Sequence, residues 1–109
     1  MTNSSQPSET DRLTISIDPD LEEIVPGFLE NRRKDVVTLH SAVKCNDLKT
    51  IRLLGHRMKG DGGSYGFDAI SSIGDAIEQA AIREDCAVIS EQIDKLCDFL
   101  GRVEVVYRK

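Results

Sequence analysis

The sequence has no tryptophan, and aromatic residues make up only 5% of it. A surface on which nucleic-acid bases stack needs several aromatic side chains, and a net charge of −5 opposes binding to a polyanion. No apolar run approaches the roughly 20 residues that span a bilayer. The N-terminus also lacks the basic and apolar regions of a secretory signal. We therefore expect a cytoplasmic protein with neither a nucleic-acid nor a membrane partner.

Cysteine and histidine are also scarce. Cys45, Cys86 and Cys97 are odd in number, widely spaced and without a Cys-x-x-Cys pair, which argues against a disulfide framework or a structural zinc site. We interpret them as reduced, mostly buried thiols that fill gaps in the core. His40 and His56 have no third or fourth ligand near them in the sequence, so we expect no metal site and interpret His40 as a structural or surface residue.

What remains is the composition of one globular domain, with 39% hydrophobic and 30% charged residues in a chain of 109. Residues 1–12 are polar and aperiodic, whereas residues 13–17 alternate apolar and polar side chains. We therefore predict a flexible or extended tail over residues 1–17 and a domain over residues 18–109. Because a lone strand cannot form a sheet, the alternating segment is expected to lie as an extended strap against the domain.

Helical periodicity dominates after the tail. Asp18 and Pro19 predict the N-cap and first residue of a short helix over residues 19–25, which Pro26 would interrupt because it lacks an N–H. The first three principal helices are expected over residues 26–45, from about 48 into the glycine-rich stretch 60–66, and over about 67–83. Asp85 is expected to cap the fourth, whose apolar positions run from Ile89 to Val103. The short connections between these helices predict an all-α fold, an antiparallel up-down-up-down four-helix bundle with a short extra N-terminal helix.

The most informative stretch reads RLLGHRMKGDGGSYG, from Arg52 to Gly66. At about 100° per residue, His56 lies opposite the apolar positions of this helix and is predicted to be exposed. The residues expected on the same side are Lys49, Arg52, Lys59, Gly60 and Gly63. A neutral imidazole is a nucleophile at cellular pH, and cations beside it would attract and stabilise a phosphoryl group.

Simpler interpretations of this stretch stay open. GDGGSYG can be a loop after a helix that ends at Lys59, and a lone exposed histidine on a helix is usually only a surface residue. If Gly55, Gly60, Gly62 and Gly63 are all helical, together they cost about 2–4 kcal/mol relative to alanine. That is a large part of a total stability of about 5–15 kcal/mol. A sequence that tolerates it is expected to need a close backbone approach there.

The run HRMKGDGGSYGF, which begins at His56, closely resembles the signature of the histidine-containing phosphotransfer (HPt) family. That signature is His-x-hydrophobic-Lys-Gly, a small residue, an aromatic or aliphatic residue, Gly, then Phe or Leu. The run is also similar to the phosphotransfer domain of chemotaxis histidine kinases, in which a glutamate 22 positions downstream supports the histidine. Glu78 occupies that position here. The resemblance covers about residues 19–109, and Asp61 departs from it, because serine, glycine or alanine is usual there.

The resemblance implies a role for each matching residue. His56 would accept and donate the phosphoryl group through Nε2, and Lys59 would steady the phosphoryl oxygens. Glu78 would accept a hydrogen bond from the other ring nitrogen, the alternative being a solvated helix residue. The residues expected to dock a receiver domain are Lys49, Arg52, Gly60 and Gly63. A candidate extension of this docking face comprises Ile24, Val25 and Phe28, for which core packing is the alternative.

The implied function is that of a phosphocarrier without a kinase catalytic domain. It would take a phosphoryl group from a receiver-domain aspartate or a hybrid histidine kinase and pass it to another receiver in a two-component phosphorelay. No phosphate-binding loop of the type GxxxxGK[ST] is present, so phosphate is expected from another protein. We expect a monomer with no cofactor of its own and Mg²⁺ on the partner receiver.

The sequence is also compatible with three other functions. The first is a helical docking module that regulates a kinase or response regulator without carrying phosphate. The second is a domain fed directly by a kinase catalytic domain. The third is a metal-binding bundle that uses His40 and His56.

Overall fold

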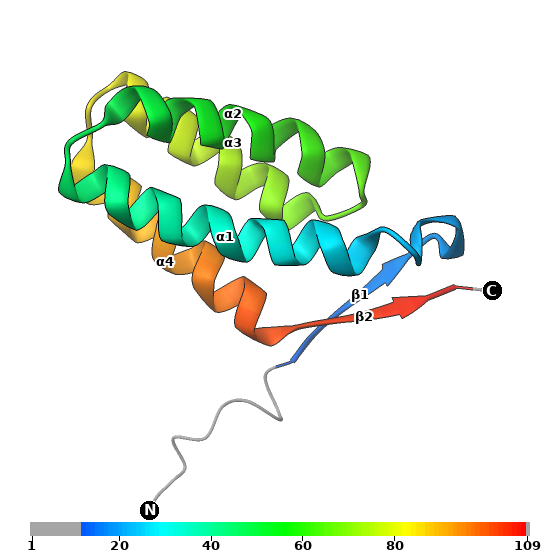
Figure 1. Ribbon diagram of the computed structural model, residues 1–109. Coiled ribbons are helices and arrows are strands. Elements are labelled where there is room, and N and C mark those ends of the chain that lie inside the picture. Colours follow the sequence, from blue (N-terminus) through cyan, green and yellow to red (C-terminus); the bar gives the residue numbers. More distant parts are fainter. Residues whose placement is uncertain (1–11, 109) are drawn as a thin grey trace, which may run out of the picture.

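The computed structural model describes residues 12–108, which form four long helices and two short strands (Figure 1). In chain order the elements are β1 (Leu13–Ile17), the 3-10 helix η1 (Pro19–Leu21), α1 (Val25–Lys44), α2 (Leu48–Ser64), α3 (Asp68–Ile82), α4 (Cys86–Arg102) and β2 (Val103–Tyr107). The four principal helices predicted from periodicity are therefore present. Most of the predicted tail, residues 1–11, lies outside the described residues. Within them, no helix has both the length and the apolar character that crossing a membrane requires.

Short acidic caps set where two of the helices begin. Asp47 and Asp85 accept hydrogen bonds from the backbone N–H groups of Thr50 and Val88, both at 3.2 Å, and so satisfy donors that have no partner inside α2 and α4. The Thr50 hydroxyl also donates to the Asp47 carboxylate at 2.7 Å. These two hydrogen bonds hold the pKa of the Asp47 carboxyl below its usual value, and the one from the hydroxyl has the larger effect.

The N-terminal helix is shorter than predicted. In place of a helix over residues 19–25, the structure has the three-residue η1, which the side chain of Asp18 caps. Pro26 does not interrupt a helix, because it lies in the first turn of α1, which begins at Val25. A proline is tolerated there, since the N–H that it lacks would have no intrahelical partner.

The two ends of the described chain pair in a parallel sheet that the sequence interpretation missed. The register runs from Leu13 opposite Val103 to Ile17 opposite Tyr107. The segment of β1 is extended as predicted, but it pairs with a second strand. The prediction that placed Val103 in the last helix was wrong, because Val103 is the first residue of β2. Pairing satisfies backbone groups that a lone strand would leave open. Ile17 is only 2% exposed, and its Cδ1 would lie 3.0 Å from a Cβ atom built on Gly66, in the turn after α2.

Aliphatic side chains from all four helices fill the core. Its most completely buried helical members include Leu39, Ile51, Met58, Ile70, Ile77, Ile89, Ile93 and Leu96. The cysteines are not among them: Cys45, Cys86 and Cys97 are free and exposed, which corrects the prediction of buried thiols. Cys45 caps the C-terminus of α1 and Cys86 is the first residue of α4, so both lie at helix ends.

Candidate functional site

His56 lies on the exposed face of α2, as the helical rotation predicts, and 69% of its side chain is accessible. Its Nδ1 atom is 3.0 Å from Oε2 of Glu78, which is on α3. Because an ionised carboxylate can only accept a hydrogen bond, Nδ1 is the protonated nitrogen of the neutral ring. The other nitrogen, Nε2, therefore carries the lone pair that a nucleophile needs.

Glu78 has an environment unlike that of His56. Only 13% of its side chain is exposed, so it is not the solvated helix residue of the alternative interpretation. Within the described residues, its second oxygen, Oε1, is buried without a hydrogen-bond partner. Over residues 12–108, the imidazole is thus the single hydrogen-bonding partner of the carboxylate. A buried anion with one partner interacts strongly with positive charge that develops on that partner.

Lys59 follows His56 by three residues on α2 and is anchored to α3 at two points. Its Nζ atom lies 3.2 Å from Oδ1 of Asp75, and both side chains are about half exposed. The hydroxyl of Ser71 donates to the backbone carbonyl oxygen of Lys59 at 2.7 Å. Neither of these α3 residues, Ser71 and Asp75, was predicted from the sequence. Ser71, Asp75 and Glu78 are separated by intervals of four and three positions, which place all three on one helix face.

Glycines let α2 and α3 approach so closely that these contacts form. A Cβ atom on Gly55 would lie 2.7 Å from the backbone nitrogen of Glu78, and one on Gly74 would lie 2.5 Å from that of Lys59. Gly62 is restricted in the same way, because its Cβ atom would lie 2.5 Å from the backbone nitrogen of Ser71. The predicted close backbone approach exists, and at Gly55 and Gly62 it is to α3 of the same chain.

The glycine-rich stretch is helical as far as Ser64, so the alternative of a loop after Lys59 is wrong. Gly60 and Gly63 differ from Gly55 and Gly62 on the same helix. A Cβ atom on Gly60 would meet nothing within 4 Å, and one on Gly63 would meet only the Ser71 hydroxyl at 3.9 Å. These two positions leave bare backbone on the face of α2 that carries His56.

The remaining members of the predicted docking face divide between surface and core. Lys49 and Arg52 are exposed on α2, and Ile24 is 48% exposed. Val25 and Phe28 are buried, at 1% and 6% exposure, so including them in a docking patch was wrong. The ring of Phe28 stacks on those of Tyr65 and Phe67, with centroids 4.3 and 5.5 Å apart, and packing inside the molecule accounts for its burial.

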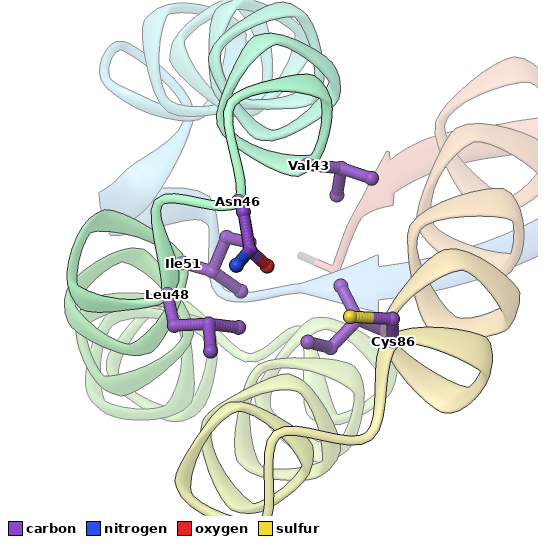
Figure 2. A pocket seen from close by; sticks show the side chains of 6 residues that line it. Val43, Asn46, Leu48, Ile51 and Cys86 are labelled. Atoms are coloured by element: carbon purple, nitrogen blue, oxygen red, sulfur yellow. The ribbon is translucent and has the colours of Figure 1, made fainter.

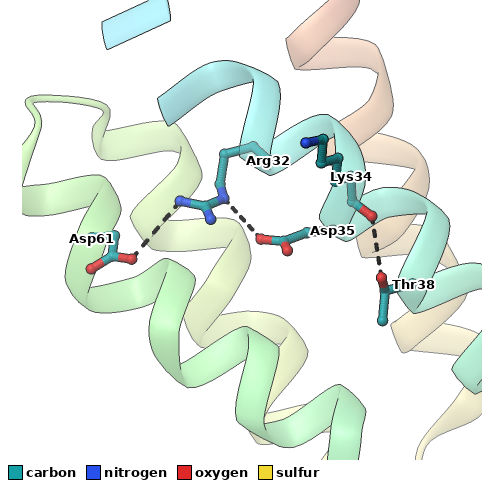
Figure 3. A network of polar contacts seen from close by, with 5 residues as sticks. All are labelled: Arg32, Lys34, Asp35, Thr38 and Asp61. Atoms are coloured by element: carbon teal, nitrogen blue, oxygen red, sulfur yellow. Dashed lines mark hydrogen bonds and ion pairs between the residues drawn. The ribbon is translucent and has the colours of Figure 1, made fainter. Parts of the chain in front are cut away.

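Asp61 faces α1, as Figure 3 shows. Its Oδ2 atom lies 3.8 Å from a terminal guanidinium nitrogen of Arg32, whose Nε is 2.8 Å from Oδ2 of Asp35. The Arg32 guanidinium also lies over the ring of Phe28, 4.8 Å from its centroid. The residue that departs from the HPt signature thus takes part in a polar contact between α1 and α2.

Elsewhere, the described part of the chain offers a small pocket at one end of the bundle and no metal-binding cluster. Figure 2 shows a pocket whose lining includes Val43, Asn46, Leu48, Ile51 and Cys86. Its volume of about 10 Å³ leaves room for no more than about one water molecule. Over residues 12–108, no group of three or more His, Cys, Asp or Glu side chains is arranged to hold a metal ion. Among the described residues, the exposed ring of His56 with Glu78 at its Nδ1 atom is the strongest candidate for chemistry.

A family model described as "Hpt domain" matches residues 23–104, more than half of the chain and a range that contains α1 to α4. The matched range also includes His56, Lys59, Asp75 and Glu78. Neither the comparison with curated proteins nor that with solved structures gave a significant match.

Proposed function

The chain belongs to the Hpt domain family, and from this premise we propose that His56 carries a phosphoryl group between partners of a two-component phosphorelay. Membership implies histidine phosphotransfer in general, and interaction with receiver domains and kinases in general. The observation that supports the specific residue is the exposed ring of His56, held through Nδ1 by Glu78 at 3.0 Å.

In the proposed transfer, the donor is an aspartyl phosphate on a receiver domain. The lone pair of His56 Nε2 attacks phosphorus, the Nε2–P bond forms, and the bond between phosphorus and the aspartyl oxygen breaks. The electron pair leaves with the aspartyl carboxylate, while Nδ1 keeps its proton. Positive charge that develops on the ring is stabilised by Glu78, whose carboxylate already accepts the Nδ1–H hydrogen bond. Donation to a second receiver is the same step in reverse.

Basic side chains on α2 would assist from the exposed side. Lys59 would contact the phosphoryl oxygens, while Lys49 and Arg52 would attract the acidic pocket of a receiver. The bare backbone at Gly60 and Gly63 would let that partner approach. The chain would act as a carrier with no cofactor of its own, and Mg²⁺ would be bound by the receiver.

The proposal also covers the arrangement of the molecule. The four helices would run up-down-up-down, each antiparallel to the next, in a cytoplasmic monomer. Contacts between α2 and α3 support the antiparallel arrangement of these two helices, because they pair His56 with Glu78 and the later residue Lys59 with the earlier residue Asp75. The tight turns between successive helices support it as well.

The test is transfer of ³²P from receiver domains charged with acetyl phosphate. We expect acid-labile, alkali-stable label on the wild type and none on His56→Gln. The matched control is His40→Gln, since His40 is the only other histidine of the chain and is also exposed. It should label like the wild type. Receiver binding without label on the wild type would instead favour the docking module that regulates its partner without carrying phosphate.

A further inference from the structure

We propose that Asp75 regulates how available Lys59 is to the phosphoryl group: it holds the lysine while His56 is unmodified and yields it when phosphate arrives. This inference rests on the proposed function. It gives Asp75 the role of a positioning residue that acts through Lys59. The consequence is a less stable phosphohistidine, which passes its phosphoryl group on more readily.

The geometry places Asp75 in the same row as the site. Asp75 precedes Glu78 by three residues on α3, and Lys59 follows His56 by three residues on α2. The two contacts between the helices, 3.0 Å for the His56–Glu78 pair and 3.2 Å for the Lys59–Asp75 pair, are therefore neighbours one turn apart. Glu78 hydrogen-bonds the nucleophile His56, and Asp75 holds Lys59, the cation that would contact the phosphorylated histidine.

The backbone of Lys59 is fixed while its ammonium group is free to change partners. Ser71 donates to the Lys59 carbonyl oxygen, and Gly74 lies against its backbone nitrogen, so α2 has little room to shift at this point. The side chains of Lys59 and Asp75 are nevertheless 49% and 47% exposed. Solvent screens such a pair, and the interaction is weak enough for a nearby dianion to displace Asp75.

This exchange opposes phosphorylation in two ways. The Lys59–Asp75 contact must break before the ammonium can contact phosphoryl oxygens, and the carboxylate it leaves lies close to a new negative charge. Both effects favour the unmodified histidine. We assign the effect of Asp75 to the first, because its carboxylate is about half exposed and solvent screens the direct repulsion. Removing the charge of Asp75 therefore changes phosphohistidine stability only while Lys59 is present.

The test compares Asp75→Asn with the wild type in equilibrium with a phosphorylated receiver and in labelling by phosphoramidate, a small donor that needs no docking surface. We expect the ratio of phosphorylated to unmodified His56 to rise by up to about fivefold, the range that an exposed ion pair spans. The matched control is Asp98→Asn, which removes an exposed carboxylate 2.8 Å from Arg102 on α4. It should leave the ratio unchanged.

A double-variant cycle separates action through Lys59 from simple repulsion. In a Lys59→Gln background, Asp75→Asn is expected to change the ratio by less than the error of measurement. A rise that persists in that background would overturn the inference, as would an unchanged or lower ratio in the single variant.

These outcomes are distinct from failure of the proposed function. Label on His56 in every variant with equal ratios would overturn the role of Asp75 alone. Absence of label on wild-type His56 with both donors would overturn the phosphocarrier assignment and this inference with it.

Discussion

Glu78 directs one carboxylate oxygen at His56 and buries the other without a partner among the described residues. An unsatisfied buried acceptor costs roughly 1–3 kcal/mol, which folding alone does not explain. The negative charge of Glu78 has a role at the imidazole ring of His56. The carboxylate fixes the proton on Nδ1 and is already in place to stabilise the cationic ring that forms when Nε2 is phosphorylated.

We predict that Glu78→Gln slows phosphoramidate labelling of His56 by roughly tenfold or more, because a hydrogen bond to a charged group is worth about 1.5–3 kcal/mol. Glutamine keeps the size and one acceptor oxygen but loses the charge. The free energy of unfolding, measured with urea, should stay the same or rise, because a buried charge without full compensation is removed. Glu91→Gln, at an exposed position on α4, is the matched control. An unchanged labelling rate in Glu78→Gln would show that the carboxylate does not support the ring.

Between elements, the contact of α2 with α3 decides whether the site exists. Gly55, Gly62 and Gly74 each face backbone atoms of the other helix at distances that a side chain could not share. The close approach carries Glu78 to His56 and Asp75 to Lys59. Glycine lowers the intrinsic stability of a helix. At these three positions the loss of helix propensity is accompanied by close packing of α2 on α3.

This difference between glycines predicts a contrast between two identical substitutions. Gly55→Ala should lower the free energy of unfolding by about 1–3 kcal/mol, the usual penalty of overpacking, and should slow phosphoramidate labelling by moving Glu78 away from His56. Gly60→Ala meets open space and should raise the free energy of unfolding by about 0.5–1 kcal/mol.

Labelling distinguishes the two positions further. Gly60→Ala should label with phosphoramidate at the wild-type rate but accept phosphate from a receiver more slowly, because its methyl group occupies the docking face. Equal effects of the two substitutions on stability and on phosphoramidate labelling would contradict the packing explanation.

At the scale of the whole molecule, the parallel pairing of β1 with β2 joins segments from opposite ends of the described chain (Figure 1). Two strands alone are marginally stable, so the pair depends on packing against the bundle. Ile17 provides part of this packing beside Gly66, in the turn that connects α2 to α3. The sheet thus supports one end of the bundle without contributing a residue to the site.

We predict that Ile17→Ala lowers the free energy of unfolding by about 2–5 kcal/mol, the range for removing a large buried aliphatic side chain. Thr14→Ala, at an exposed position of the same strand, should change it by no more than about 0.5 kcal/mol. Below the unfolding transition, phosphoramidate should label both variants at the wild-type rate. A loss for Ile17→Ala as small as that for Thr14→Ala would show that β1 does not contribute to the core.

The sequence by itself determined the four helices and the exposed position of His56, because helical periodicity and caps act between residues a few positions apart. The signature around His56 also pointed to the family and to Glu78. Only the tertiary structure decided which surfaces meet. It buried Val25 and Phe28, exposed the cysteines, paired β1 with β2 and set Asp75 against Lys59. Burial and pairing of this kind depend on residues that are distant in the sequence. The spacing of residues a few positions apart does not specify which distant residue a side chain will contact.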